Sequence, residues 1–414
     1  MGHHQVLIIG GGTAGIMVAS QLRKADSKID IGIIEPAETH YYQPAWTLVG
    51  ANTFKMSETA RSMKSLIPSG VKWIKEYADT FDPDNNAVTT QNGDTYTYDV
   101  LVVAPGIKID PSLVPGLTEV MDKGVVCSNY TDPEHTWEVL KNFKGGTALF
   151  TQPTTPFKCG GAPQKIMYLA DEAFRKQGVR SKTTVAYAMG GDVMFAVPKI
   201  SKSLMTVVDR KDIQVGFGHQ LVEVDGENQI AWYTKAPHYS IHNDKKIEMI
   251  EDGDRVGIKY DMLHLAPPQS APDFIRNSPL VTAEGWLSVD IHTLQHTKYS
   301  NIFGLGDSAQ LPTAKTGAAI RKQVPVVVAN VQQIAQNQGI SSKKYDGYSS
   351  CPLVTGYGKM ILAEFDYDKK FTPDPKLKQM LITDSSKEHW RLWILKKYML
   401  PYLYWNKMMK GVQV

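Results

Sequence analysis

A glycine-rich turn between an apolar strand and an apolar helix constrains this chain more than any other feature. Residues 5–9 form a short, continuously apolar run, the turn GGGTAG occupies 10–15, and residues 16–22 have helical periodicity. A second apolar run at 29–34 ends at Glu35. Strand, glycine turn, helix, strand and acid in this order predict a dinucleotide-binding α/β unit.

Each glycine of the turn has a physical role. Gly10 permits the tight turn, Gly12 lets the backbone approach a pyrophosphate, and Gly15 lets helix and strand pack closely. The N–H groups at the start of the helix meet the phosphate charge. Glu35, twenty residues after Gly15, is placed to accept hydrogen bonds from ribose hydroxyls.

Length and charge narrow the class of protein. At 414 residues the chain is too long for one ordinary core, which favours two nucleotide-sized domains and a smaller appendage. A formal charge of +3 does not indicate a nucleic-acid partner. The first strand follows Met1 so closely that we expect no cleavable targeting segment. Three cysteines are too few for a structural disulfide framework.

Two further stretches indicate that the nucleotide is FAD. The buried run YDVLVVAPG, at 98–106, ends at Gly106 and resembles the second flavin motif of two-dinucleotide flavoproteins. The run NIFGLGD, at 301–307, resembles their third motif, whose aspartate, here Asp307, reaches the ribityl chain. We therefore expect an α/β protein with two Rossmann-like domains and a C-terminal amphipathic helical segment for membrane attachment.

The middle of the chain is expected to form the second dinucleotide-type domain without a tight NAD(P)H site. Its strand at 183–189 is followed by Gly-Gly-Asp at 190–192, which lacks the three-glycine spacing needed to hold a pyrophosphate. Electrons should therefore enter from a donor other than nicotinamide. The expected divisions are 1–115 for the first part of the FAD domain, 116–290 for the second domain, 291–340 for the return to the FAD domain, and 341–414 for the C-terminal region.

Two of the cysteines lie in sequences that suggest chemistry. Cys159 follows Lys158 and precedes a helical pattern in which Pro163 suits the first turn, so the positive end of a helix should favour its thiolate. Cys351 lies in YSSCPLVTGY, a turn-rich stretch in which we expect it to be at least partly accessible. Cys127 is expected to be either inert or a third redox cysteine, and both readings stay open.

The segments KCGGAPQK, GLGDSAQLPTAKT, YDGYSSCPLVTGY and ILAEFDY resemble the sulfide:quinone oxidoreductases, in the branch that includes the mitochondrial enzyme. The resemblance implies that Cys159 and Cys351 are a redox pair, bridged at rest by a disulfide or an inserted sulfur. Hydrosulfide would attack at Cys351, leave a persulfide there and release Cys159 as thiolate. Two electrons would pass through FAD to ubiquinone or menaquinone, and the sulfane sulfur to sulfite, a thiol or sulfide.

The resemblance also carries over individual positions. Lys315 would stabilise negative charge on the reduced flavin, and Lys165 would support charge near the cysteines, although either could be an ordinary solvated lysine. Tyr357 and Phe365 could shape a quinone slot, although aromatic residues in such positions are usually core. The expected flavin-binding positions are Gly10, Gly12, Thr13, Ala14, Gly15, Glu35, Gln43, Ala78, Gly106, Asp307 and Lys315.

The last segment predicts a surface helix at a membrane. Residues 387–414 hold six lysines or arginines and one acid, with tryptophans and tyrosines interleaved. The longest uncharged stretch, 398–406, is far shorter than the roughly 20 residues needed to span a bilayer. Pro401 is expected to break the segment into two short helices. The alternative is a helix docked on the protein core.

The expected location is a membrane surface, and the start of the chain favours a bacterial inner membrane, or a mitochondrial one if a presequence was removed. We expect no metal site, because His264 and His296 have no neighbours at ligand spacing. A homo-oligomer is allowed. The rival functions are a type II NADH:quinone reductase, a flavocytochrome-linked sulfide dehydrogenase, and a non-catalytic flavin-bound sulfur sensor or persulfide carrier.

Overall fold

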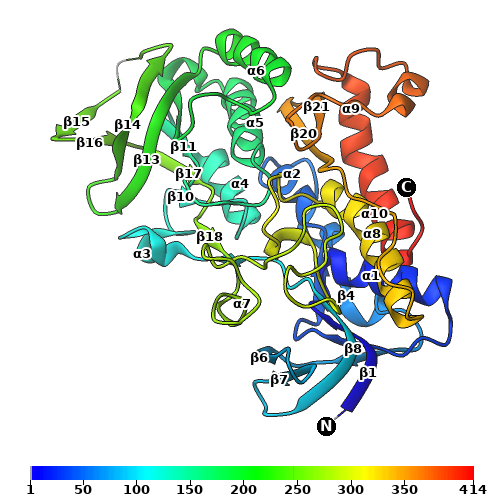
Figure 1. Ribbon diagram of the computed structural model, residues 1–414. Helices are drawn as coiled ribbons and strands as arrows, with labels where there is room; N and C mark the ends of the chain where they lie inside the picture. The colour runs from blue at the N-terminus through cyan, green and yellow to red at the C-terminus, as the bar shows by residue number, and fades with distance from the viewer. Residues whose placement is uncertain (1, 246) are drawn as a thin grey trace.

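The computed structural model describes residues 2–245 and 247–414 and contains two α/β lobes. The early and late parts of the chain form the first lobe, and the middle of the chain forms the second (Figure 1). In Figure 1 the second lobe, in green, lies above the first, and the C-terminal helix, in red, runs along the side of the molecule toward α1. The predicted pair of Rossmann-like units is confirmed.

A parallel sheet in the order β5, β2, β1, β8, β19 forms the first lobe, and the start of β8 also pairs with the antiparallel strands β7 and β6. Alternate residues of β1 face opposite ways: Val6 and Ile8 pack with α1 and α8, whereas Leu7 and Ile9 join the cluster on the other face. The elements are β1 (Gly2–Ile9), α1 (Thr13–Ala25), β2 (Ile31–Ile34), β5 (Val71–Ile74), β6 (Ala78–Asp82), β7 (Ala87–Thr90), β8 (Thr95–Val103), β19 (Ile302–Gly304) and α8 (Gly317–Ala335).

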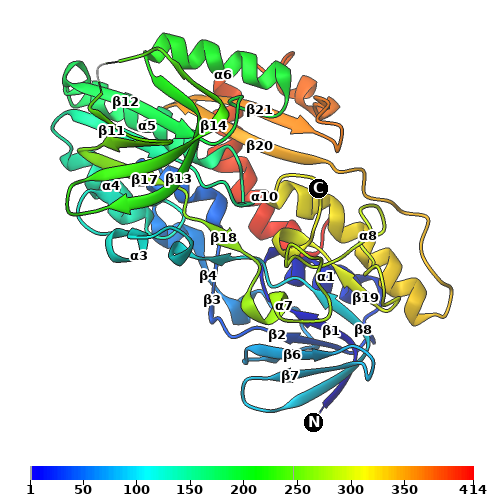
Figure 2. The same cartoon turned by 60° about the vertical axis from the view of Figure 1, so that its left-hand side comes forward.

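The second lobe has a mixed sheet in the order β10, β17, β11, β12, β13, β14, β16, β15. The first five strands are parallel and the last three add antiparallel pairs. One face packs against α4, α5 and α6, which are visible above the first lobe in Figure 2. The elements are β10 (Val126–Cys127), α4 (Pro133–Asn142), β11 (Gly146–Thr151), α5 (Ala162–Lys176), β12 (Thr183–Met189), α6 (Pro198–Lys211), β13 (Gln214–Asp225), β14 (Ile230–His242), β15 (Met249–Asp252), β16 (Arg255–Lys259) and β17 (Met262–Leu265).

The chain crosses between the lobes through two short paired strands, β9 (Lys108–Ile109) and β18 (Gln269–Ser270). The second sheet ends at Leu265, and Ala271, Ile275 and Trp286 pack in the same cluster as the strands of the first sheet. The return to the first lobe therefore begins near β18, earlier than the boundary at 290 expected from the sequence. The hydrophobic pattern of 271–289 does not reveal which of two similar sheets it covers.

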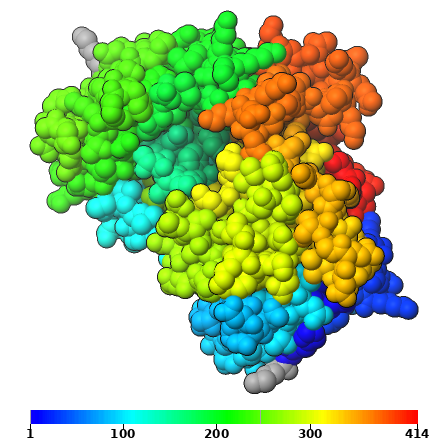
Figure 3. Space-filling view, viewed as in Figure 1, coloured from blue at the N-terminus to red at the C-terminus, as the bar shows by residue number. Residues whose placement is uncertain are grey.

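The C-terminal region adds a hairpin and a helix. Strands β20 (Ser349–Gly356) and β21 (Lys359–Phe365) form the hairpin, which packs into the core of the second lobe beside α5. In Figure 3 this orange region lies between the green second lobe and the yellow return segment. Cys351 is thus part of a strand and is 1 % exposed, so the expected accessible turn is wrong.

The C-terminal helix continues through Pro401. It comprises α9 (Trp390–Ile394), a π-helical turn (Leu395–Met399) and α10 (Leu400–Asn406). Proline has no N–H and cannot donate the usual helical hydrogen bond. The π-helical turn just before Pro401 is wider, with the Leu400 N–H donating to the Leu395 carbonyl, and it accommodates the proline within the helix. The expected break into two helices is therefore wrong.

The C-terminal helix has a buried face and an exposed apolar face. Leu392, Trp393, Tyr404 and Trp405 are buried against the protein. No helix within residues 2–245 and 247–414 is both long enough and apolar enough to cross a bilayer. The exposed face carries Trp390, Ile394, Tyr398, Met399 and Tyr402.

Candidate functional site

The glycine turn after β1 leaves space for a ligand at one position only. Gly10 has a φ of +97°, and a Cβ atom at Gly15 would lie 1.9 Å from the Gly10 carbonyl oxygen, so both positions require glycine. A Cβ atom at Gly12 would meet no described atom within 4 Å. The structure thus supports the three roles expected for these glycines, because only Gly12 faces open space. Thr13 and Ala14 begin α1 directly beside it.

Glu35 is held in place beside this turn at the end of β2. Its two carboxylate oxygens accept hydrogen bonds from the Gly11 N–H and the Ala37 N–H, each at 2.7 Å. Burial raises the pKa of Glu35, and these two bonds partly oppose that rise. The carboxylate is therefore fixed at the carboxyl edge of the sheet, where a ribose would be bound.

Asp307 and Lys315 lie on the return segment, after β19. The Lys315 ammonium donates to the carbonyl oxygens of Asp307 at 2.6 Å and Ala309 at 3.1 Å, and burial lowers its pKa to about 8. Burial raises the pKa of Asp307, and its Oδ1 atom has no hydrogen-bond partner among the described residues. A buried carboxylate oxygen without a partner indicates a ligand hydroxyl.

The donor set fits FAD. The open face of Gly12, the Glu35 carboxylate and the unpaired Asp307 oxygen follow β1, β2 and β19, which are parallel strands of one sheet. Ligands of such sheets bind at the carboxyl ends of the strands. Gly12 would face the pyrophosphate, Glu35 a ribose and Asp307 the ribityl chain.

The other expected flavin positions are less informative. Gly106 follows β8 with a φ of +80° and has open space at its Cβ position. Ala78 is buried at the start of β6. Gln43 is exposed and accepts a hydrogen bond from the Lys158 ammonium, which connects it to the residue before Cys159.

The two expected redox cysteines meet across the fold. Their Sγ atoms lie 3.7 Å apart, although 192 positions separate them in the chain. Cys159 precedes α5 and has a φ of +85°, a conformation that costs a non-glycine residue about 1–3 kcal/mol. Cys351 lies over Gly161, where a Cβ atom would be 2.6 Å from its sulfur. The strained backbone of Cys159 and the missing side chain at Gly161 both allow the two sulfurs to lie this close.

The surroundings place the negative charge on Cys159. The hydrogen bond from Cys351 and the nearby Lys165 ammonium hold the pKa of Cys159 well below its usual value, while the same hydrogen bond and burial raise the pKa of Cys351. Lys165 donates to the Cys159 sulfur at 3.2 Å. Burial alone would lower the pKa of Lys165, but the charge on the two cysteines outweighs it and raises that pKa. Lys165 is thus a buried cation and not a solvated one.

Lys396 is a site residue that the sequence did not predict. It lies in the π-helical turn, is 2 % exposed and donates to the Pro44 carbonyl oxygen at 2.6 Å. Burial and the positive charge of Lys165 lower its pKa to about 7, and the charges on the two cysteines oppose this. By charge alone Lys396 belongs to the cations of the membrane segment. Its position one helical turn after the buried Leu392 was the signal for an inward side chain.

A second contact missed by the sequence joins the C-terminal helix to the phosphate turn. The Tyr404 hydroxyl lies 2.5 Å from His40 Nε2 and 2.7 Å from Thr13 Oγ1. Burial lowers the pKa of His40 to about 4, so this histidine is neutral at neutral pH. Tyr42 packs against Tyr404 with ring centroids 4.6 Å apart. The helix that carries Lys396 is therefore anchored beside Thr13.

Cys127 differs chemically from the two expected redox cysteines. It is fully buried in β10, and burial raises its pKa far above the usual value. The charged groups that affect it most are Asp122 and Asp132, and its strand pairs with β17. A buried, protonated thiol is unreactive, which favours the inert reading.

His264 and His296, the two histidines weighed as metal ligands, form hydrogen bonds within the protein. His264 Nε2 lies 2.6 Å from Asn129 Oδ1, and His296 Nε2 lies 3.1 Å from the Leu280 carbonyl oxygen. Burial lowers the pKa of His264 to about 3. In the part of the chain that the structure describes, no three His, Cys, Asp or Glu side chains are grouped to hold a metal ion.

Tyr357 and Phe365 do not form one aromatic slot. Phe365 pairs with Ser349 at the open end of the hairpin, whereas Tyr357 follows Gly356 at its turn. The length of β21, about 20 Å at the rise of a β-strand, separates them. Phe365 packs on Phe195, and the Tyr357 hydroxyl donates to the Ala51 carbonyl oxygen at 3.1 Å. The expectation that the two residues shape one slot is therefore wrong, and contact of either residue with a quinone stays a prediction.

Fold and site together define an FAD-dependent oxidoreductase of the two-dinucleotide-domain class. The family model described as pyridine nucleotide-disulphide oxidoreductase matches residues 4–142. The solved sulfide:quinone oxidoreductase of Aquifex aeolicus has the same fold, with a TM-score of 0.77 at 18% identity, covering 100% of this chain and 92% of that one.

The family is decided by curated relatives over nearly the full length. The mitochondrial sulfide:quinone oxidoreductase of Mus musculus is 42% identical over 412 residues, which cover 99% of this chain and 87% of that protein. The protein of the same name from Dictyostelium discoideum is also 42% identical, over 98% of this chain and 86% of its own. The chain belongs to the sulfide:quinone oxidoreductase family.

Proposed function

We propose that this chain oxidises hydrogen sulfide through Cys159 and Cys351 and passes two electrons, through FAD, to ubiquinone or menaquinone in a membrane. The sulfane sulfur is left on Cys351 for a small acceptor such as sulfite, a thiol or sulfide. The observation that carries the proposal is the pair of sulfurs 3.7 Å apart, with a buried ammonium 3.2 Å from one of them. The names of the family relatives support the substrate and the acceptor.

The difference between the cysteines sets the direction of the reaction. In the oxidised protein the two sulfurs form a disulfide, and the better leaving group is the thiol of lower pKa. Because the Lys165 ammonium lies 3.2 Å from the Cys159 sulfur and favours a thiolate there, hydrosulfide attacks the Cys351 sulfur and the disulfide bond breaks toward Cys159. The new bond joins the sulfide sulfur to Cys351 as a persulfide. Cys159 leaves as a thiolate beside Lys165.

The acceptor then completes the turnover. It attacks the outer sulfur of the Cys351 persulfide, the sulfur–sulfur bond breaks, and Cys351 is left reduced. When the Cys159–Cys351 bond forms again, two electrons leave the pair. FAD, when bound, takes up these two electrons and delivers them to the quinone. The backbone of Lys315 pairs with that of Lys158, so Lys315 lies beside the residue that precedes Cys159.

Lys396, which is buried, is the proton acceptor in this proposal. A lysine with a pKa of about 7 is neutral in a large fraction of molecules at neutral pH. Its charge interacts with both cysteines, so it is close enough to affect their protonation. In the proposal, neutral Lys396 takes the proton that hydrogen sulfide gives up before attack. The positive charges of Lys165 and of protonated Lys396 both favour the hydrosulfide anion that forms.

A nicotinamide donor is not favoured by the loop after β12. At Gly190 a Cβ atom would lie 3.0 Å from the Thr154 side chain, and the Gly190 carbonyl lies 2.9 Å from His238 Nε2. These contacts close the turn after β12. By sheet order β11 corresponds to β1, and the segment between β11 and α5 carries Cys159 and the pair Gly160 and Gly161 in place of a three-glycine turn. This agrees with the absence of a second three-glycine pattern.

The decisive experiment is an anaerobic titration of the FAD-loaded protein. Sulfide should bleach the flavin absorbance, and a soluble quinone should restore it. NADH should leave the spectrum unchanged. If NADH bleaches the flavin while sulfide does not, the type II NADH:quinone reductase reading replaces the proposal. If the protein consumes only one equivalent of sulfide and quinone does not restore the flavin absorbance, the chain is a sulfur sensor or persulfide carrier.

The exposed face of the C-terminal helix supports membrane attachment. Trp390, Tyr398 and Tyr402 are 58%, 57% and 57% exposed and follow each other at one-turn or two-turn spacing. Large aromatic side chains exposed along one face of a helix beside lysines are typical of a helix in the membrane surface. Quinone in the lipid would then be near the lobe that holds FAD.

We expect the triple variant Trp390→Ser, Tyr398→Ser, Tyr402→Ser to lose at least about 10-fold in affinity for phospholipid vesicles, because each aromatic buries apolar area in the interface. Co-sedimentation with vesicles measures this. Tyr77→Ser is the matched control, since Tyr77 is 59% exposed on a loop of the first lobe and should leave binding unchanged. Equal binding of the triple variant and the native protein would contradict a membrane role for this face.

A further inference from the structure

Strand β20, which carries Cys351, is fixed to helix α5 at two points. At one point Cys351 and Leu353 cover Gly161, where a Cβ atom would lie 2.6 Å from the cysteine sulfur and 2.2 Å from the leucine side chain. At the other point the hairpin turn reaches Glu172 on α5. The Tyr357 N–H donates to Glu172 Oε2 at 2.6 Å, and a Cβ atom on Gly356 would lie 2.0 Å from Glu172 Oε1.

These two points span most of α5. Eleven residues of helix from Gly161 to Glu172 cover about 16 Å, and six residues of strand from Cys351 to Tyr357 cover about 20 Å. The strand therefore lies along the helix and is held at both ends. Cys159 and Lys165 are at the first end, and the Glu172 contact is at the second.

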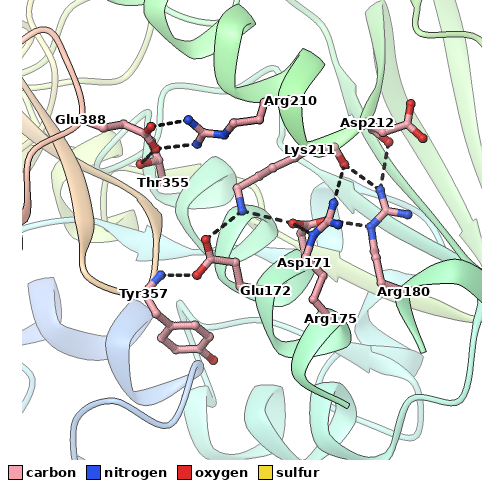
Figure 4. Close-up of polar contacts among 10 residues, drawn as sticks. All are labelled: Asp171, Glu172, Arg175, Arg180, Arg210, Lys211, Asp212, Thr355, Tyr357 and Glu388. Carbon is pink, nitrogen blue, oxygen red and sulfur yellow. Dashed lines mark hydrogen bonds and ion pairs between the residues drawn. The ribbon is translucent and has the colours of Figure 1, made fainter. Parts of the chain in front are cut away.

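Glu172 is itself held by a buried lysine at the end of α6 (Figure 4). Lys211 donates to Glu172 Oε1 and to Asp171 Oδ2, each at 3.1 Å, and is 4 % exposed. Asp171 also accepts from Arg175 at 3.0 Å and from Arg180 at 2.6 Å. A carboxylate with this many charged donors is fixed in position. Lys211 cannot move without breaking that cluster.

Arg210, the residue before Lys211 on α6, makes a second connection to the hairpin. Arg210 donates to both oxygens of Glu388, at 2.5 and 2.8 Å, and Glu388 Oε1 accepts from the Thr355 hydroxyl at 2.5 Å. Thr355 and Tyr357 flank Gly356 at the end of β20, so two consecutive cations hold the residues on either side of Gly356 through two carboxylates. Figure 4 shows both connections, with Glu172 between Lys211 and Tyr357. We call these two connections the hairpin clamp.

We propose that the hairpin clamp sets the spacing of Cys159 and Cys351, and that Glu172 is a positioning residue for the redox pair although it binds neither sulfur. The inference rests on the proposed function of that pair. A shift of the strand by one residue moves Cys351 by about 3.3 Å, nearly as far as the 3.7 Å between the sulfurs. The clamp therefore keeps the two sulfurs within reach of a bond.

The physical consequence is an effect on the disulfide equilibrium. Two thiols held at the correct distance form a disulfide more readily than two thiols on mobile elements, because the cost of ordering them has already been met. Oxidised glutathione accepts the two electrons of the pair, so that two protein thiols and one oxidised glutathione give one protein disulfide and two reduced glutathiones. The equilibrium constant of this exchange measures the positioning directly.

The test uses the full-length, FAD-loaded protein equilibrated in glutathione buffers, with alkylation and peptide mass spectrometry of Cys159 and Cys351. In Glu172→Ala the equilibrium constant for disulfide formation should fall about 10-fold, because a charge-assisted contact is lost. Glu172→Gln should fold normally, since its amide oxygen still accepts from the Tyr357 N–H. Its equilibrium constant for disulfide formation should fall about 3-fold. Glu251→Ala removes a surface ion pair with Lys235 and should leave the equilibrium unchanged.

The outcomes separate the clamp from the proposed function. If both Glu172 variants keep the native equilibrium constant and differ only in thermal stability, Glu172 is merely structural and the clamp is wrong, while sulfide still bleaches the native flavin. If the native cysteines form no disulfide in any buffer and sulfide does not bleach the flavin, the proposed function fails and the clamp fails with it. A fall in both variants, with an unchanged control, supports the clamp.

Discussion

Replacing Cys351 by serine is expected to slow the bleaching of the flavin by sulfide at least about 10³-fold, because no sulfur then remains to receive hydrosulfide. Cys159→Ser should have an effect of similar size. In that variant no disulfide forms, so there is no bond for hydrosulfide to break. Stopped-flow absorbance under anaerobic conditions measures both rates.

Two controls make this result specific. Cys127→Ala should keep the rate within about twofold, because Cys127 is fully buried and its raised pKa keeps it protonated. Dithionite should still bleach the flavin in all three variants, which shows that FAD is bound. If Cys351→Ser is bleached by sulfide at the native rate, the cysteine mechanism is wrong.

Replacing Lys165 by methionine is expected to slow sulfide-dependent bleaching about 100-fold at neutral pH. The ammonium lies 3.2 Å from the Cys159 sulfur, Lys165 is buried and Cys159 is half-buried, so removal of the ammonium leaves a thiolate without its cation. The leaving group is then poorer, because the pKa of Cys159 rises toward its usual value. Lys165→Arg keeps the charge and should recover most of the rate.

The pH dependence tests the cause. In the native protein the Cys351 hydrogen bond and the Lys165 ammonium hold the pKa of Cys159 well below its usual value, which favours the thiolate at neutral pH. In Lys165→Met the thiolate forms only at higher pH, and the deficit should shrink as pH rises. The rate of Cys159 alkylation by iodoacetamide, measured against pH on the reduced protein, should show the same upward shift. An unchanged alkylation profile would mean that Lys165 acts only through packing.

Much of the flavin site could be predicted from short stretches of sequence. The turn from Gly10 to Gly15 and the acid Glu35 follow strands whose order is read directly along the chain. The helix after Cys159 was recognised from Pro163 and the apolar period that follows it. These features depend on contacts between residues close in sequence, which local spacing describes well.

Other features could not be read from local spacing. The boundary near β18 depends on which of two similar sheets residues 271–289 cover, and their apolar pattern fits either. Pro401 was expected to break a helix, but packing of the flanking turns against the protein retains the helix and changes only one turn. Cys351 appeared to lie in a turn, because its serine and glycine neighbours are common there, whereas pairing with β21 makes it a strand residue.

The sequence by itself determined the class of fold, the place of the nucleotide and the identity of the two cysteines. Only the tertiary structure decided that their sulfurs meet, because 192 positions separate them and the distance depends on how β20 lies along α5. It also decided that Lys396 faces the site and that Glu172 holds the hairpin. Such contacts join elements from distant parts of the chain, and their geometry is set by the packing of whole helices and strands.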